Sequence, residues 1–445
     1  MQKYYLLNLG CPKNEVDGQY LEGLLREEGF EASPDELTSD LIIINTCGFI
    51  VSAQEESINA ILEAVRLKEQ KDFKLIVVGC LSQRFKEELA RELPEVDVFM
   101  GAGIEIEFRN LLRKIKFQGL KGQECFFSPP FARGDYSTGN RKVSGPSAYL
   151  KIAEGCDNRC SYCTIPNIRG PFRSRPLKDL IQETRDLVNQ GVKEIILVAQ
   201  DTGRYGIDLY EEKRLVDLLQ GLNSIEELRW IRLMYLQPGG IEDNLLDLVA
   251  REKKILPYLE IPMQHIQPDI LHNMNRVGNE RVLRELVQRI RARIPGVILR
   301  TTFMVGFPGE SEEDFECLYN FVDEVRPERM GVFKYSPEEG TPAARMVGQV
   351  SEKLKEERYR RLEKLQYEIA REKNQELVGE IHEVLIEEIH PDYSLGRTRG
   401  DAPEIDNLVI VEGQQQVEIG GIYPVKIVLA LEYELVGEIC HEFAQ

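Results

Sequence analysis

Short apolar runs alternate with longer amphipathic stretches over residues 1–115. The apolar runs predict strands at 4–9, 41–45, 74–79 and 96–100. The stretches between them repeat apolar positions every three or four residues and predict helices at 15–28, 53–68 and 83–92. Strands separated by single helices are typical of a doubly wound parallel sheet with right-handed crossovers, so we expect an α/β fold here.

The same alternation of apolar runs and amphipathic stretches returns over residues 148–377. Strands are predicted at 149–153, 194–199, 229–234, 258–262, 298–305 and 329–335. Helices are predicted near 177–190, 241–251, 279–293 and 311–325, followed by a long charged helix at about 352–377. Six strand–helix units are too few for a closed eight-stranded barrel and predict an open, partial (β/α)6 barrel, whose sites lie on the loops after the strands.

The pattern changes twice more along the chain. Residues 378–445 carry only short β-like runs, at 384–389, 408–411, 423–431 and 435–439, and predict a small antiparallel β-barrel. Residues 117–147 contain a Pro-, Gly- and Ser-rich segment and are interpreted as a linker. The predicted domains are therefore 1–116, the linker 117–147, 148–377 and 378–445.

Composition narrows the class of protein. The chain has 445 residues, 42% of them hydrophobic and 29% charged, which is ordinary for a soluble protein of two to four domains. No apolar run reaches transmembrane length, and the apolar segment at the N-terminus is too short for a signal peptide. We therefore expect a cytoplasmic protein without membrane contact, and we also expect it to be a monomer. Nine cysteines, an odd number, favour metal binding or reactive thiols over disulfides.

Charge is distributed unevenly along the chain. The formal net charge is −19. Residues 378–445 hold 14 Asp and Glu but only 3 Lys and Arg, so their net charge is 3 − 14 = −11. Such a surface repels nucleic acid phosphates and complements a basic protein. The alternative, that the acidity serves only solubility, stays open at this point.

Three cysteines stand close together at Cys156, Cys160 and Cys163, in the spacing C-x3-C-x2-C. Three thiolates can hold three irons of a four-iron cluster, which normally takes four cysteines, and no fourth follows locally. One iron is then left open to bind a reactant. A zinc site and three unrelated buried cysteines are the alternatives, but zinc wants a further ligand nearby and the closest downstream histidine is His265.

A second set of cysteines, Cys11, Cys47 and Cys80, follows three successive predicted strands. Ligands bind at the carboxyl edge of an open parallel sheet, where these residues should meet. Helix N-termini there are expected to lower the thiol pKa. The set predicts a second cluster site that is again one ligand short. The alternative is that cysteine is simply a frequent buried residue at strand ends.

Together these features resemble the radical S-adenosylmethionine (SAM) methylthiotransferase family over essentially the whole chain. The stretches that carry the resemblance are 9–14, 45–49, 78–81, the cysteine loop after 155, 200–202 with 205–206, and 305–310. Residues 378–445 resemble a TRAM domain. Two branches compete: one modifies an adenosine next to the tRNA anticodon, and the other an aspartate of small-subunit ribosomal protein S twelve. Residues 165–176 and 401–406, the latter preceded by 396–399, resemble the second branch.

The resemblance implies two 4Fe–4S clusters and a division of labour between them. The Cys156 cluster would bind SAM and cleave it reductively to a 5′-deoxyadenosyl radical, which removes a hydrogen from the unactivated β-carbon of the aspartate. The Cys11 cluster would carry the sulfur, and a second SAM would supply the methyl group. A flavodoxin or ferredoxin is the expected electron donor, and S twelve the substrate, free or within the small subunit. An iron–sulfur electron-transfer protein without catalysis is the rival from a different class.

Further SAM contacts are expected from six residues, and no residue is assigned a catalytic role. They are Tyr162 before the last cysteine, Gln200 and Asp201 at the second barrel strand, Gly306 near the adenosine, and Arg173 and Arg175 at the SAM carboxylate or the substrate. The alternatives are that the glycine only turns the chain and that the arginines only solvate a loop.

Overall fold

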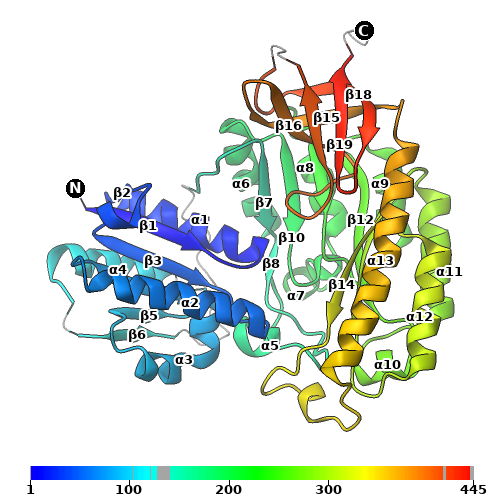
Figure 1. The fold of residues 1–445 in the computed structure, drawn as a ribbon. Coiled ribbons are helices and arrows are strands. Elements are labelled where there is room, and N and C mark those ends of the chain that lie inside the picture. Colours follow the sequence, from blue (N-terminus) through cyan, green and yellow to red (C-terminus); the bar gives the residue numbers. More distant parts are fainter. Residues whose placement is uncertain (1, 104, 121, 128–140, 414–416, 441–445) are drawn as a thin grey trace. The chain divides into compact units, whose positions relative to one another are not determined.

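The computed structural model describes residues 2–103, 105–120, 122–127, 141–413 and 417–440, drawn in colour in Figure 1. The chain forms two compact units. The first combines residues 1–143, 151–179 and 338–341, and the second combines 144–150, 180–337 and 342–445. The Cys156 loop therefore folds with the N-terminal sheet. The Pro-rich part of the predicted linker, at 128–140, lies outside the described residues.

The first unit is built on a six-stranded parallel sheet with the order β2-β1-β3-β4-β5-β6. Its strands are β1 (Lys3–Asn8), β2 (Glu31–Ala32), β3 (Leu41–Thr46), β4 (Lys74–Gly79), β5 (Val98–Met100) and β6 (Glu124–Phe126). The predicted doubly wound parallel sheet is confirmed. Residues 124–126, predicted as linker, instead form the edge strand β6, because their backbone pairs in register with β5.

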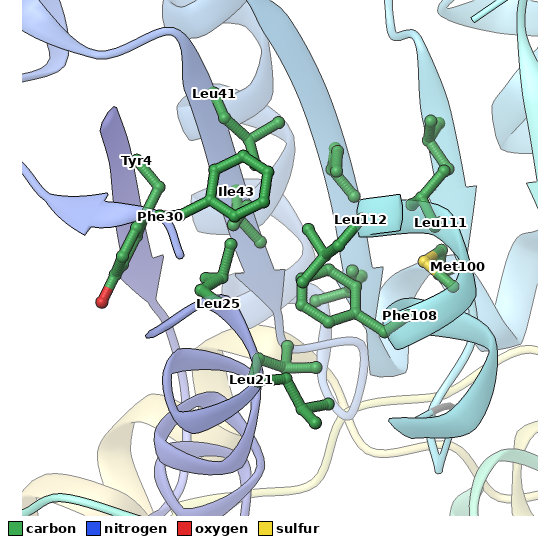
Figure 2. Close-up of a cluster of buried hydrophobic side chains, with 14 residues drawn as sticks. Tyr4, Leu21, Leu25, Phe30, Leu41, Ile43, Met100, Phe108, Leu111 and Leu112 are labelled. Carbon is green, nitrogen blue, oxygen red and sulfur yellow. The ribbon is translucent and has the colours of Figure 1, made fainter. Parts of the chain in front are cut away.

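Helices cover both faces of this sheet (Figure 1). They are α1 (Pro12–Glu27), α2 (Val51–Lys68), α3 (Cys80–Glu92) and α4 (Glu105–Phe117). Figure 2 shows the core on one face, where Leu21 and Leu25 of α1 and Phe108 and Leu112 of α4 pack against the strands. Ile61 of α2 and its neighbours from α3 pack on the opposite face. Helix α4 was not predicted from the sequence pattern.

The second unit is built on six strands in the order β14-β13-β12-β11-β10-β7. Its strands are β7 (Ser147–Lys151), β10 (Glu194–Val198), β11 (Trp230–Leu233), β12 (Ile255–Gln264), β13 (Ile298–Val305) and β14 (Arg329–Lys334). The helices are α6 (Leu177–Asn189), α7 (Ile207–Tyr210), α8 (Leu215–Asn223), α9 (Asp243–Arg251), α10 (Pro268–Asn273), α11 (Glu280–Arg293), α12 (Glu312–Val325) and α13 (Glu352–Glu376). The partial barrel is confirmed. No helix in the described ranges is long and apolar enough to cross a membrane.

A closed five-stranded barrel completes the second unit. Its strands are β15 (Ile381–Ile389), β16 (Tyr393–Thr398), β17 (Leu408–Glu412), β18 (Ile422–Ala430) and β19 (Glu434–Ile439). The predicted β-barrel is confirmed, with one addition to its topology: β17 and β19 pair in parallel, whereas the other four pairings are antiparallel. Strand β16 was not predicted.

Buried ion pairs connect this barrel to the strands of the same unit. Glu194 of β10 accepts hydrogen bonds from Arg232 at 2.7 Å and from Arg397 of β16 at 2.6 Å, and all three side chains are almost fully buried. Burial raises the pKa of the Glu194 carboxyl, but the two guanidinium groups lower it further, to about 2. This carboxylate therefore stays ionised and holds both arginines.

The stretch 401–406 makes the remaining ion pairs of this junction. Asp401 accepts a hydrogen bond from Arg329 of β14 at 2.7 Å. Asp406 pairs with Arg300 of β13 and accepts the Tyr258 hydroxyl at 2.7 Å. The two aspartates, which belong to the stretch that resembles the second branch of the family, are thus buried structural partners of barrel arginines.

A second buried cluster lies where β13 ends. Glu310 accepts hydrogen bonds from Arg358 of α13 at 2.7 Å and from the Gly306 backbone N–H at 2.9 Å. His265 is fully buried, and its Nδ1 accepts the Gln267 backbone N–H at 3.1 Å, which requires that nitrogen to be unprotonated. Burial lowers the pKa of His265 to about 4.

We expect Asp401→Asn to destabilise the second unit by roughly 3 kcal/mol, because it leaves the Arg329 charge buried without its carboxylate partner. Urea unfolding followed by fluorescence measures this unit directly, since Trp230, the one tryptophan of the sequence, is buried in β11. Asp392→Asn, at an exposed turn, is the matched control. Equal unfolding midpoints for the two variants would contradict a structural role for Asp401.

The His265 pKa predicts a pH dependence of stability. Because the folded value lies below the unfolded one, the stabilisation is complete above about pH 6.5 and is lost as the pH falls towards 4. Since each pKa unit corresponds to about 1.4 kcal/mol, protonation of His265 should lower the free energy of unfolding by roughly 3 kcal/mol. His265→Asn keeps an acceptor for Gln267 and cannot be protonated, so the loss should be smaller in this variant than in the wild type. Trp230 fluorescence in urea at pH 7 and pH 4.5 measures the difference.

Candidate active site

The cysteines Cys11, Cys47 and Cys80 lie at the carboxyl edge of the first sheet, as predicted. They follow β1, β3 and β4, which are neighbours in the sheet. In a parallel sheet of this order the chain reverses its direction of winding between β1 and β3, and ligands bind in the crevice at that point. Cys11 and Cys47 flank this crevice, and Cys80 stands one strand further on.

The three loops that carry these cysteines touch one another through their backbones. A Cβ atom on Gly10 would lie 2.6 Å from the Cys47 Cβ. A Cβ atom on Gly48 would lie 2.7 Å from the Leu81 Cα and 2.9 Å from the Cys80 carbonyl carbon. A side chain at either glycine would therefore push two cysteine loops apart. Glycine beside the cysteine is what lets three thiols share one small volume.

Side-chain hydrogen bonds fix the loops in this arrangement. The Asn14 amide donates to the carbonyls of Leu9 at 2.7 Å and Thr46 at 3.2 Å, so it joins the ends of β1 and β3. The Ser57 hydroxyl accepts the Cys47 N–H and donates to the Cys47 carbonyl, both at 3.0 Å. Arg84 donates to the Gly48 carbonyl at 2.8 Å and forms an ion pair with Glu338. These protein contacts hold the three loops together at the end of the sheet.

Burial, rather than the nearby helix N-termini, has the largest effect on the pKa of the thiols at this site. Cys47 and Cys80 are 8% and 6% exposed. Burial raises the pKa of the Cys47 thiol and raises that of Cys80 to about 12, while Arg169 lowers both. The expected lowering of the thiol pKa is therefore wrong for these two residues. Coordination by a metal would supply the positive charge that the thiolates need.

The donor set consists of three thiols, the ligand type that iron–sulfur clusters take. Within the described ranges no three His, Cys, Asp or Glu side chains converge closely enough to hold one metal ion. Thiolates on one zinc ion stand about 4 Å apart, since each lies about 2.3 Å from the metal. A four-iron cluster binds each thiolate through a different iron, so its ligands stand further apart.

The Cys156 loop is a compact structure between two short paired strands, β8 (Ala153–Glu154) and β9 (Arg173–Ser174). The Cys156 N–H donates to the Gly170 carbonyl at 3.1 Å, and the Cys163 N–H to the Cys160 carbonyl at 3.0 Å. The short helix α5 (Ile165–Ile168) follows. All three cysteines are half-buried, as is Tyr162. The loop thus presents its thiols with partial access to solvent.

The two predicted arginines of this loop bind protein groups. Arg173 donates to the carbonyls of Pro171 at 2.9 Å and Arg169 at 3.0 Å. Arg175 is buried, donates to the Lys151 carbonyl at 2.9 Å and lies over the Tyr20 ring at 5.9 Å. Both have structural roles in the first unit, and their contacts to SAM or the substrate remain predictions.

The other predicted contacts belong to the second unit. Gln200 and Asp201 follow β10, and Gly306 follows β13, so all three lie at carboxyl ends of strands in one parallel sheet. The Gln200 Oε1 atom is buried without a hydrogen-bond partner among the described residues, as expected for a group that meets a ligand. The Gly306 N–H is already bonded to Glu310. A SAM contact at each of these residues remains a prediction.

One contact was missed by the sequence analysis. Arg169 of the Cys156 loop donates from Nε to the Cys80 sulfur at 3.1 Å, and from Nη2 to Asn14 at 3.0 Å. The loop that carries Cys156, Cys160 and Cys163 therefore touches the site of Cys11, Cys47 and Cys80 directly. The residue lies in the stretch 165–176 that carried the family resemblance, but spacing could not distinguish it from Arg173 and Arg175.

Family models match three successive parts of the chain. Uncharacterized protein family UPF0004 matches residues 3–101, the radical SAM superfamily matches 150–322, and the TRAM domain matches 378–440. Among solved structures, the radical SAM methyltransferase TsrM of Kitasatospora setae, with cobalamin and a 4Fe–4S cluster bound, aligns with a TM-score of 0.57. It is 16% identical and covers 77% of this chain and 74% of its own, which shows a shared fold.

Curated relatives match along almost the entire chain. A protein of Desulforamulus reducens named ribosomal protein uS12 methylthiotransferase RimO is 47% identical over 441 residues, 98% of each chain. Proteins of the same name from Pelobacter propionicus and Caldicellulosiruptor saccharolyticus are each 45% identical, with 98% and 99% of this chain covered and 98% and 100% of their own. The radical SAM and TRAM matches fall on the barrel and the C-terminal domain described above. The chain therefore belongs to the RimO family of radical SAM methylthiotransferases.

Proposed function

We propose that this transferase adds a methylthio group to the β-carbon of an aspartate in ribosomal protein uS12. The observation that carries the proposal is the pairing of two three-cysteine sites in one compact unit, in direct contact through Arg169 and Cys80. A methylthiotransferase needs both a radical source and a sulfur source. A radical SAM enzyme that does not transfer sulfur needs only the radical source.

Cys156, Cys160 and Cys163 would hold the cluster that, when bound, supplies the electron for reductive cleavage of SAM. Cys11, Cys47 and Cys80 would hold a second cluster, which supplies the sulfur. The buried Asn14 and Ser57 keep the second set of loops in register, and Cys47 and Cys80 are themselves buried. Glu310 fixes the Gly306 backbone where the adenosine contact is predicted.

The surface of the C-terminal barrel supports a basic protein as substrate. Asp401 and Asp406 are taken up by buried ion pairs, yet ten other acidic residues of the barrel are exposed. These are Glu380, Glu383, Glu388, Asp392, Glu404, Glu412, Glu418, Glu432, Glu434 and Glu438. Of the three basic residues in this domain, Arg397 is buried among carboxylates. The exposed face is therefore strongly anionic, which favours a cationic protein and opposes tRNA phosphates.

A low-potential donor such as a flavodoxin or ferredoxin would supply the electron, and the enzyme would act as a monomer on free uS12 or on the small subunit. It would work in the cytoplasm, where ribosomal proteins are made. Opposite-charge recognition predicts that uS12 binding weakens as ionic strength rises.

Two cysteine variants test the two sites separately. After anaerobic reconstitution, the triple variant Cys156→Ala/Cys160→Ala/Cys163→Ala should retain about half the iron and sulfide of the wild type, because the N-terminal site is independent. The triple variant Cys11→Ala/Cys47→Ala/Cys80→Ala should retain the other half. Cys125→Ala/Cys317→Ala, at two exposed cysteines, is the control and should load fully. Zinc with little iron in the wild type would contradict both sites.

The reaction is tested with recombinant uS12 and with tRNA. Reconstituted enzyme, dithionite and SAM should yield 5′-deoxyadenosine and uS12 in which a methylthio group replaces one hydrogen, as detected by mass spectrometry. Both products should disappear in the Cys156→Ala/Cys160→Ala/Cys163→Ala variant. Methylthio-adenosine in the tRNA with unmodified uS12 would favour the tRNA branch instead. Absence of 5′-deoxyadenosine from the loaded wild type would favour an electron-transfer protein.

A further inference from the structure

Arg169 lies at the C-terminal end of α5, six residues after Cys163, and is 4% exposed. Every polar edge of its guanidinium group faces a protein acceptor. Nη1 donates to Asp17 at 2.5 Å and to Glu154 at 3.3 Å, and Nη2 donates to Asn14 at 3.0 Å. Because the group is planar and rigid, these bonds fix the direction of the remaining N–H. That Nε–H points at the Cys80 sulfur, 3.1 Å away.

Arg169 belongs to a buried group of four charged side chains that balance one another. Lys151, which is 1% exposed, forms ion pairs with the same two carboxylates, Asp17 and Glu154. Two cations therefore face two carboxylates in a buried cluster, and neither carboxylate belongs to Arg169 alone. A thiolate or cluster sulfur at Cys80 would be the third anion of this group and would bring its net charge to −1.

Backbone contacts within its own loop also hold Arg169. Its backbone N–H donates to the Ile165 carbonyl at 2.7 Å, and its own carbonyl accepts from Arg173. The paired strands β8 and β9 close the loop, and Glu154 at the end of β8 binds the guanidinium. The side chain should thus keep its place when the three cysteines of its own loop are removed.

We propose that Arg169 is a positioning residue of the N-terminal cluster, which donates a hydrogen bond to the Cys80 sulfur and raises the reduction potential of that cluster. The inference rests on the proposed function, because it requires a cluster at Cys11, Cys47 and Cys80. Reduction adds one electron, and with it one negative charge, to the cluster and its ligand sulfurs. A cation and an N–H donor beside a ligand sulfur stabilise the reduced state more than the oxidised one, and so raise the potential.

The test uses the full chain with Cys156→Ala/Cys160→Ala/Cys163→Ala as background, so that one cluster remains. Arg169→Met is added, which keeps the volume of the side chain and removes its charge and N–H groups. The control is Arg109→Met, which removes a surface guanidinium paired with Glu27 at the opposite end of α1 from Cys11. A 16-residue helix is about 24 Å long, so Arg109 is too far away to act on the cluster.

Dithionite supplies the electron in an anaerobic titration followed by electron paramagnetic resonance. We expect Arg169→Met to shift the one-electron reduction equilibrium about tenfold towards the oxidised cluster, which corresponds to a midpoint about 59 mV more negative. Arg109→Met should titrate like the background protein. A midpoint that is unchanged in Arg169→Met, or that shifts equally in both variants, would overturn the proposal.

Arg169→Lys resolves the case in which the methionine variant binds no iron. Lysine retains a positive charge beside Asp17 and Glu154. It has one nitrogen instead of three, so it lacks the Nη1 and Nη2 hydrogen bonds that direct the arginine Nε–H at the Cys80 sulfur. A loaded lysine variant with a lowered midpoint supports the proposal, and one with the background midpoint overturns it. Loss of iron from both variants, with circular dichroism unchanged, would show a role in assembly and overturn the proposed tuning. If the background protein itself carries no iron, the proposed function fails, a different result from any of these.

Discussion

Parallel hydrogen bonding between β1, β3 and β4 is the interaction on which the candidate site of the first unit depends. Parallel strands end at the same edge of a sheet, so the residues after them meet although they are more than thirty positions apart in the chain. Cys11, Cys47 and Cys80 occupy these positions. The glycines beside them then allow the loops to approach to backbone contact, and Asn14 joins the ends of two strands. The sheet positions the thiols, and the loops only adjust them.

Buried charge organises both units in the same way. In the first, Lys151 and Arg169 share Asp17 and Glu154, and in the second Arg232 and Arg397 share Glu194. Removing such groups from water is costly, and the cost is recovered only when every partner is in place. These networks therefore favour one arrangement over near alternatives more than they add stability. In the first unit the arrangement brings the Cys156 loop against Cys80, and in the second it attaches the C-terminal barrel to the strands of the sheet.

The acidic residues of the C-terminal barrel divide into two groups with different roles. Asp401 and Asp406 face inward and neutralise Arg329 and Arg300, whereas the exposed glutamates give the domain its anionic surface. Net charge alone would have assigned both groups to substrate recognition. Burial separates them, because a carboxylate that is fully paired inside the protein contributes little to the field that a distant partner experiences.

Alternating apolar and amphipathic segments determined the three folded parts of the chain and their class, because periodicity depends on local sequence alone. The two cysteine sets could also be found from sequence, since each follows a predictable strand or has a diagnostic spacing. The sequence did not predict α4, β6 or β16, short or weakly periodic segments that tertiary pairing stabilises. Nor could it show that Arg169, rather than Arg173 or Arg175, contacts Cys80, or that Asp401 and Asp406 are buried. Only the tertiary structure decides these points, because hydrogen bonding and burial depend on residues that are remote in the chain.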